Sequence, residues 1–444
     1  MCEEPKKEHL FFASGFRVEK AGKVRKKIMS TNNNRVWNFI QEYSVLLIFG
    51  ALSALIWANI HYDSYHHIVD FVILDHSPVG HLHDGHRTLT VHYLVNDVLM
   101  ALFFAMAGKE VWEAVALKDG SLRGKKAMTP LIATAGGMIG PVAIYLVGAF
   151  LLGKFAILAN GWAIPTATDI AFSYLVGRII FGAKHPAVGF LLLLAIADDA
   201  TGLIILAIFY PQGELSLEWL LLSFGAAVAV YVLFNLLPRK MDNGDAARPV
   251  SSMVRSRFGV WPYAIAGMAS WYGFQEAGIH PALGLLPVVM TLPHADHDFG
   301  IFGAEEVHQH DLLNDTEHSL KMPVEVILLL FGFANAGVVF SAIGDATWLV
   351  LAGLIVGKPV GVLLFGAVAA VMLRLGLPEG MRVIDLLIIG FVAAIGFTVS
   401  LFISAVAFAP GEVQDAAKMG ALFSFGAVFL SIAVAKMIGV KKIQ

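Results

Sequence analysis

The stretch LLLLAIADDATGLIILAIF, residues 191–209, carries two adjacent aspartates, Asp198 and Asp199, in the middle of an otherwise apolar run. An apolar run of this length can cross the hydrocarbon core of a lipid bilayer. A charge at the centre of the bilayer costs roughly 2.5–3.5 kcal/mol on insertion scales, so charged residues at that depth usually have a function. The stretch therefore predicts a membrane helix with a functional pair of carboxylates.

The rest of the chain has the same character. Of its 444 residues, 57% are hydrophobic and 15% are charged, and the mean hydropathy is +0.71. A soluble protein of this composition could not cover itself with polar surface. Apolar runs separated by turns and charges predict about twelve transmembrane helices in an all-α polytopic membrane protein. They fall near 43–60, 94–115, 129–152, 162–180, 187–209, 217–237, 258–274, 279–292, 322–340, 347–372, 384–408 and 414–437.

Lysine and arginine gather in alternate loops, which places both termini in the cytoplasm under the positive-inside rule. We expect a cytoplasmic N-terminal tail over 1–42, a transporter domain over 43–437 and a cytoplasmic tail over 438–444. Within the domain, 61–93 is expected to be periplasmic. The acidic, histidine-containing loop 293–321 is expected in the cytoplasm. The basic N-terminus lacks the apolar segment and cleavage site of a signal peptide.

Two further charges lie deep in predicted spans, Asp169 in GWAIPTATDIAF (161–172) and Lys358 in LAGLIVGKPVGVLLF (351–365). One alternative is a purely structural ion pair between Lys358 and Asp198. One lysine cannot neutralise three carboxylates, however, so a net negative site remains. Oxygen ligands favour hard cations, which predicts a site where Na⁺, Li⁺ and protons compete. The single cysteine excludes a cysteine-rich metal site or an intrachain disulfide.

Two predicted spans are interrupted by helix-breaking and polar residues. These residues are Gly161, Pro165, Thr166 and Thr168 in the fourth span, and Gly390, Gly396, Thr398 and Ser400 in the eleventh. Interrupted helices in corresponding positions of two halves of a chain point to a transport site at the membrane midplane. Half-helix ends carry partial charges, which Asp169 and Lys358 are placed to offset. Close helix packing is the alternative explanation for the glycines.

Several of these segments resemble the signature segments of NhaA-type bacterial sodium–proton antiporters, a family that is itself a standard example of the broken-helix pattern. They are GWAIPTATDIAF, AIADDATGLIILAIFY, FGFANAGV, LIVGKPVGVLLF and GFVAAIGFTVSLFISAVAF, and the resemblance runs from about residue 45 to residue 437. It implies inverted repeats and two unwound helices, 4 and 11, that cross at the site. It also implies electrogenic exchange of intracellular Na⁺ or Li⁺ for external protons by alternating access, in the inner membrane and without a cofactor. Such transporters serve pH homeostasis and salt tolerance.

The resemblance assigns roles to individual residues. Asp199 matches the principal Na⁺-binding carboxylate, and Asp198 matches the neighbour that pairs with Lys358 and exchanges protons. Thr168 and Asp169 match residues of the unwound helix beside the ion. The unwound segments are expected to be supported by Pro165, Gly396 and Thr398.

Looser matches concern regulation. Glu110, His280, Glu317 and His318 match residues linked to pH response, although basic residues expected beside the two glutamates are missing. Asp97 matches a residue of structural or transport importance, with an N-cap as the alternative.

The periplasmic segment 61–93 is expected to form a hairpin that makes a homodimer. Its histidines, including His81, His83 and His86, leave open a metal site or, more simply, a solvated loop.

Other functional classes of membrane protein would require different sequence features. A sodium-coupled solute symporter of similar fold would need polar groups for an organic substrate, and the spans offer few. A channel would need a polar-lined path, and an inactive scaffold would not need Asp198, Asp199 and Lys358 together. No nucleotide-binding loop, nucleic-acid patch or hydrolytic triad occurs, so the sequence predicts a transporter and not an enzyme.

Overall fold

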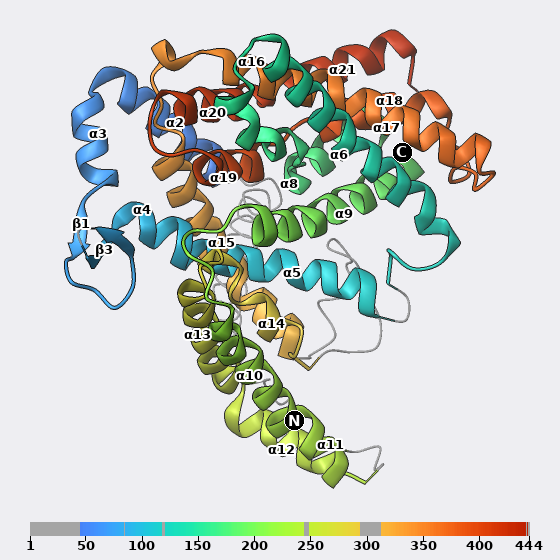
Figure 1. Ribbon diagram of the computed structural model, residues 1–444. Coiled ribbons are helices and arrows are strands. Elements are labelled where there is room, and N and C mark those ends of the chain that lie inside the picture. The colour runs from blue at the N-terminus through green and yellow to red at the C-terminus, as the bar shows by residue number, and fades with distance from the viewer. Residues whose placement is uncertain are drawn as a thin grey trace, which may run out of the picture.

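The computed structural model describes residues 45–83, 85–117, 120–243, 248–293, 312–440 and 442. The expected tail at 1–42, most of the loop 293–321 and nearly all of 441–444 lie outside these residues, as do the side chains of Glu317 and His318. The described chain is mostly helical, with one small sheet near its N-terminal end (Figure 1).

The first part of the chain forms two helices, the sheet and a long helical run. Its elements are α2 (Val45–Ile60), α3 (Tyr62–Val69), β1 (Val72–Leu74), β2 (His81–His83), β3 (His86–Thr90), α4 (Val91–Tyr93), η1 (Leu94–Leu99) and α5 (Met100–Ala116). The antiparallel strands have the order β1-β3-β2. Thr90 starts the helical run, because its side chain accepts a hydrogen bond from the Tyr93 N–H at 3.1 Å.

The middle of the chain contains the first broken helix. Its elements are α6 (Lys125–Leu151), α7 (Phe155–Leu158), η2 (Ala159–Thr166), α8 (Ile170–Phe181), α9 (Pro186–Phe209), η3 (Leu217–Trp219), α10 (Leu220–Tyr231), η4 (Val232–Leu236), α11 (Leu237–Met241), α12 (Pro249–Phe258), α13 (Trp261–Glu276), η5 (Pro281–Leu283) and α14 (Leu286–Val289). α10, α11, α12 and α13 form an arm at the bottom of Figure 1, and a small hydrophobic cluster joins α10 and α13 to α14 and to the start of the next long helix. The expected span at 279–292 consists of two short helical segments, η5 and α14.

The last part contains the second broken helix. Its elements are α15 (Leu312–Asn335), η7 (Phe340–Ala342), α16 (Asp345–Ala352), η8 (Gly353–Gly357), α17 (Lys358–Ala367), η9 (Val368–Met372), α18 (Val383–Ala393), α19 (Phe397–Ala407), α20 (Glu412–Phe423), η10 (Ser424–Gly426) and α21 (Ala427–Ile438). These elements pack with α2, α5, α6, α8 and α9 around one large core.

Within the described residues, six helices are long and apolar enough to cross a membrane, and eight are if each bent pair counts as one span. The six are Val91–Ala116, Ala127–Leu151, Pro186–Phe209, Leu217–Met241, Asp345–Met372 and Glu412–Ile438. The prediction of a polytopic, helical membrane protein is thereby confirmed. The full set of twelve spans stays a prediction.

The two bent pairs are Phe155–Thr166 with Ile170–Phe181 and Val383–Ala393 with Phe397–Ala407, each bent by 54°. In the first pair, Ala167 has an extended backbone directly after η2. Pro165 contributes because it has no N–H to donate to the preceding turn. In the second pair, the chain passes close behind Gly396, where a Cβ would lie 2.9 Å from the Ala167 carbonyl oxygen. The two breaks therefore lie against each other.

Hydrogen bonds between the two broken helices satisfy backbone groups that the breaks leave without helical partners. The Asp169 N–H donates to the Ile395 carbonyl at 2.7 Å. The Thr168 hydroxyl shares its one hydrogen between the Ala393 carbonyl, at 3.0 Å, and an Asp198 carboxylate oxygen, and the Ser400 hydroxyl donates to the Ile164 carbonyl at 2.7 Å. Because unsatisfied backbone groups are costly in a membrane, each break is stable only beside the other.

Glycines bring α17 close to α6. A Cβ on Gly136 would lie 2.2 Å from the Gly361 carbonyl oxygen, and one on Gly140 would lie 2.2 Å from the Gly357 carbonyl oxygen. Small residues allow helix backbones to approach in this way. The close contact positions Lys358, which follows Gly357, beneath the two breaks.

Candidate functional site

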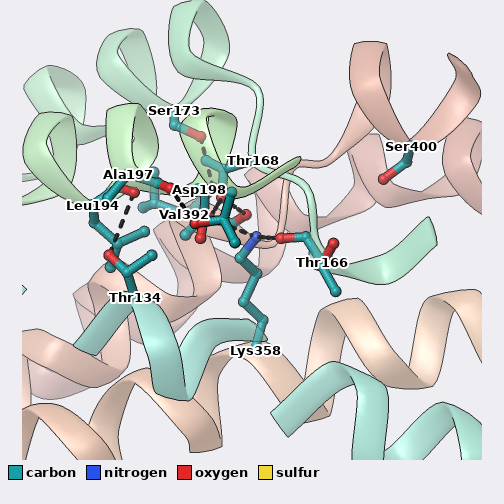
Figure 2. Close-up of polar contacts among 12 residues, drawn as sticks. Thr134, Thr166, Thr168, Ser173, Leu194, Ala197, Asp198, Lys358, Val392 and Ser400 are labelled. Carbon is teal, nitrogen blue, oxygen red and sulfur yellow. Dashed lines mark hydrogen bonds and ion pairs between the residues drawn. The ribbon is translucent and has the colours of Figure 1, made fainter. Parts of the chain in front are cut away.

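An ion pair lies at the meeting point of α9, α17 and the first break. The Lys358 Nζ atom lies 2.9 Å from Asp198 Oδ2, with the two side chains 0% and 1% exposed. The same Asp198 oxygen accepts a hydrogen bond from the Thr168 hydroxyl at 2.5 Å, and Lys358 also donates to the Thr166 carbonyl (Figure 2). Lys358 therefore contacts both a carboxylate and a backbone carbonyl at the buried C-terminal end of η2.

The pair leaves part of the aspartate unsatisfied. Asp198 Oδ1 is buried and has no hydrogen-bond partner among the described residues. A buried carboxylate oxygen without a partner costs free energy, so it needs either a proton or a cation. This oxygen is the first sign of a binding site as distinct from a structural ion pair.

Asp199 lines a small cavity of about 10 Å³ between α5, α9 and α19. The other lining residues are Phe103, Phe104, Ala107, Gly202, Leu203, Leu206 and Val399. This is close to the minimum space that one water molecule needs. The charges of Asp198, Asp169 and Lys358 all act on Asp199. The other lining residues are apolar, so within the cavity the carboxylate of Asp199 is the group that can bind a cation or a proton.

Asp169 is held by the ends of two half-helices. As the N-cap of α8, its Oδ1 accepts a hydrogen bond from the Phe172 N–H at 3.3 Å. Its Oδ2 accepts hydrogen bonds from the Thr398 hydroxyl and, at 3.4 Å, from the Thr398 N–H in the first turn of α19. A negative charge is favourable at a helix N-terminus, and the Asp169 carboxylate lies at the N-termini of both α8 and α19. The resulting site combines three carboxylates with one ammonium group.

The structure also shows where the remaining predicted residues lie. Asp97 and His280 approach each other, with Asp97 Oδ1 3.6 Å from His280 Nδ1 and both side chains buried. The N-cap alternative for Asp97 is wrong, because Asp97 lies inside η1 and the helical run is capped by Thr90. His280 itself caps η5 through the Ala282 N–H and packs against Phe402.

Glu110 lies on α5 beside Lys109, whose Nζ is 3.7 Å from Glu110 Oε1 and 2.8 Å from Glu113 Oε2. Sequence reasoning missed Lys109 and Glu113, although their spacing of four residues on a helix was a usable signal. It also missed Glu325, a buried glutamate inside the predicted span 322–340. The signal there was an acidic residue within an apolar run.

The histidine-rich hairpin gathers a different set of side chains from the one expected. His86 is joined by Asp75 and His76, and not by His81. Asp75 lies 3.3 Å from His76 Nδ1 and 3.1 Å from His86 Nε2. Desolvation acts against ionisation of Asp75, but the His76 N–H and the two imidazoles outweigh it and lower the pKa of this carboxyl. Asp75, His76 and His86 thus form one cluster whose ligand atoms lie within 4.8 Å of one another.

Comparison with known proteins identifies the family. The family model for Na⁺/H⁺ antiporter 1 matches residues 35–438. The chain is 69% identical over 415 residues to the Na(+)/H(+) antiporter NhaA of Jannaschia sp., which covers 92% of this chain and 99% of that relative. It is 44% identical to the antiporter of the same name from Desulfitobacterium hafniense (94% and 99% covered) and 41% identical to that from Geotalea uraniireducens (91% and 97% covered). The chain therefore belongs to the Na⁺/H⁺ antiporter 1 family.

Proposed function

We propose that this protein is an electrogenic secondary active antiporter that exchanges intracellular Na⁺ or Li⁺ for external protons. Family membership makes it a Na⁺/H⁺ antiporter, a transporter and not an enzyme. The observation that carries the finer proposal is the excess of carboxylates at the contact between two broken helices. Lys358 supplies one ammonium group beside Asp198 and Asp199, and Asp169, held by Thr398, adds a third carboxylate.

In this proposal Na⁺ binds at Asp199 and Asp198, and protons compete for the same oxygens. The unpartnered Asp198 Oδ1 and the cavity beside Asp199 support it, because both can accept a small hard cation. Thr168 and Thr398 hold the two neighbouring aspartates in place. Because the proton and the ion displace each other, the site can carry only one kind of cargo at a time, which is the requirement for exchange.

Alternating access would move the two broken helices relative to the rest of the bundle. We propose that they are the unwound, crossing helices 4 and 11 of a twelve-helix fold with inverted repeats. The equal bends of 54° and the hydrogen bonds between the breaks support this assignment. Discontinuous helices at the midplane provide partial charges for the ion without extended charged side chains.

We further place the protein in the inner membrane with both termini in the cytoplasm and the hairpin of 61–93 in the periplasm. The hairpin is proposed to form a homodimer. In support, β1 lies at an edge of the sheet, and its residues Val72, Ile73 and Leu74 are all exposed. An exposed apolar edge strand is a surface on which a second strand can pair.

The test is a proteoliposome with a preformed pH gradient and no organic substrate. Added NaCl or LiCl should dissipate the gradient, and the movement should generate a membrane potential. A symporter would require an organic solute, a channel would pass Na⁺ without proton movement, and a scaffold would show neither. Any of these three results would overturn the proposal.

A further inference from the structure

Glu325 is one of several buried acidic residues outside the group of three aspartates. It lies on α15, is 6% exposed, and is flanked by core residues such as Val324 and Leu328. Its Oε2 has no hydrogen-bond partner among the described residues. A structural role would require a partner for this oxygen, because an unpaired buried carboxylate is destabilising.

The position of Glu325 along α15 can be derived from contacts at the far end of the helix. Asn335 exchanges two side-chain hydrogen bonds with Asn96 of η1, at 3.1 and 2.7 Å. Four residues earlier, Phe331 lies 6.1 Å from Phe402, which lies 4.9 Å from Phe104 of α5. These contacts show that α15 and α5 run in opposite directions.

The antiparallel arrangement of α15 and α5 gives the position of Glu325 relative to the transport site. It lies ten residues before Asn335 (335 − 325), or about 15 Å along the helix at 1.5 Å per residue. Moving the same length along α5 from Asn96 leads to residue 106, next to Ala107 at the cavity of Asp199. Glu325 therefore lies at about the depth of the transport site. Consistent with this, the charge of Asp169 acts on Glu325.

The elements packed against α15 are α2, α5, η1 and α19. α2 and α19 contain no titratable residue. η1 contributes Asp97, and α5 contributes Lys109, Glu110 and Glu113, of which Lys109 is already within 2.8 Å of Glu113. On α15 itself, Lys321 lies one turn before Glu325 and has its own interaction. Among the groups that the structure describes, the charged one that acts on Glu325 is another carboxylate, that of Asp169.

We propose that Glu325 is a further proton-binding site of the exchanger, linked by charge to the transport site. The inference rests on the proposed function and deepens it. When the aspartates are ionised and empty, their negative charge favours a proton on Glu325. When Na⁺ neutralises them, that proton is held less strongly and is released. Glu325 would thereby add to the protons given up when Na⁺ binds.

The experiment measures protons released per Na⁺ bound, using purified full-length protein in detergent, weak buffer and a pH indicator, over about pH 6 to 9. Na⁺ binding is measured in parallel by calorimetry. We expect Glu325→Gln to bind Na⁺ but to release fewer protons, by as much as about one per Na⁺ within part of this range. Glu325→Asp, which keeps a titratable group, should release nearly as many as the unaltered protein.

The matched control is Asp385→Asn. Asp385 is also buried, at 1% exposure, but its carboxylate accepts hydrogen bonds from the Arg382 N–H at 2.8 Å and from the Arg382 guanidinium at 3.0 Å. Its removal should leave proton release unchanged. A fall in release as large as that of Glu325→Gln would overturn the inference, because it would reflect the loss of any buried carboxylate.

The other outcomes are also decisive. Unchanged release in Glu325→Gln at every pH would overturn this inference and leave the proposed function intact. An unaltered protein that releases no protons on Na⁺ binding would overturn both. If Glu325→Gln does not fold, Glu325→Met replaces it at similar volume. If neither variant folds, Glu325 has a structural role and the inference is wrong.

Discussion

Within the described part of the chain, two aspartate–lysine pairs join residues far apart in the sequence, and the pairs differ mainly in burial. In Asp198–Lys358 the side chains are 1% and 0% exposed, whereas in Asp345–Lys154 they are 36% and 54% exposed. Water and salt screen the outer pair, while the inner pair interacts in a medium of low dielectric constant. Desolvation of the inner pair costs several kcal/mol per ion, so stability alone is a poor reason for its presence. Because a buried pair is not screened by water, the protonation of its carboxylate can depend on whether a transported ion is bound nearby.

A third ion pair is intermediate in burial between these two. Arg87 of the hairpin bonds Glu276 at the end of α13, with side chains 27% and 17% exposed. If burial decides the energetic weight of each pair, the effects of mutation should fall in the order core, hairpin, surface. The predictions below test that order.

The largest effect is expected at Asp199, the carboxylate of the core that faces the cavity. Asp199→Asn removes its charge at nearly constant volume. We expect the protein to fold and insert, and Na⁺-dependent proton movement in proteoliposomes to be abolished. Robust exchange by this variant would show that the cavity is not the ion site.

Removal of the lysine should mainly affect stability. Lys358→Ala leaves Asp198 without its counter-charge, and breaking a buried pair in this way costs about 3–5 kcal/mol. Thermal unfolding in detergent should show a clear fall in Tm. An unchanged Tm would mean that the ammonium group does not stabilise the site.

Competition between protons and Na⁺ should control the pH dependence of transport. As pH falls through the range in which the site titrates, the apparent affinity for Na⁺ should fall by up to about tenfold per pH unit for each competing proton. The profile is measured as apparent Na⁺ affinity at several pH values. Glu110→Gln combined with Glu317→Gln should shift this pH profile by less than about one pH unit, because the profile is set by protons that compete with Na⁺ at the aspartates.

A shift of the pH profile by about one pH unit or more in that double variant would contradict this prediction. It would indicate that a dedicated pH sensor operates in addition to competition at the aspartates. In that case His280 and His318 become the next residues to replace. His280 is already occupied as a cap and a packing residue, which argues against such a role.

The sequence predicts how deep a charged residue lies in the membrane better than it predicts which partner the side chain faces. Hydropathy placed Asp198 within a long apolar helix, and Pro165 and Gly396 predicted interruptions where the structure has its two bends. Which partner each carboxylate takes was not predictable, as with Asp169 and Thr398. A helix that is apolar all round, such as α9, gives no periodic signal for its rotation. The partner depends on how the two breaks meet, which is a tertiary property.

The hairpin pair should show a moderate effect that depends on pH. The hydrogen bond from Arg87 lowers the pKa of Glu276 below its ordinary range. A lowered carboxyl pKa adds stability above the unfolded value of about 4.3, and that stability is lost as pH falls through the folded value.

Arg87→Gln should therefore loosen the hairpin near neutral pH by roughly 1 kcal/mol, discounted for partial exposure. Hydrogen exchange of the backbone over 86–90 is the readout. The difference from the unaltered protein should shrink as pH falls below the unfolded value and vanish only below the lowered folded-state pKa of Glu276. A difference that persists there would assign the effect to packing of the arginine side chain.

The smallest effect is expected for Lys154→Ala. Asp345 lies in the first turn of α16, where a negative charge is favourable without any partner. Loss of the lysine should therefore cost at most about 1 kcal/mol, and high salt should reduce the difference further. A double-mutant cycle with Asp345→Ala isolates the coupling energy of the pair from the contribution of the helix terminus. A coupling energy near that expected for Lys358 would break the comparison, because two pairs of the same chemistry would then be equally strong despite opposite burial. A coupling energy near zero would leave burial as the property that separates the ion site from the surface.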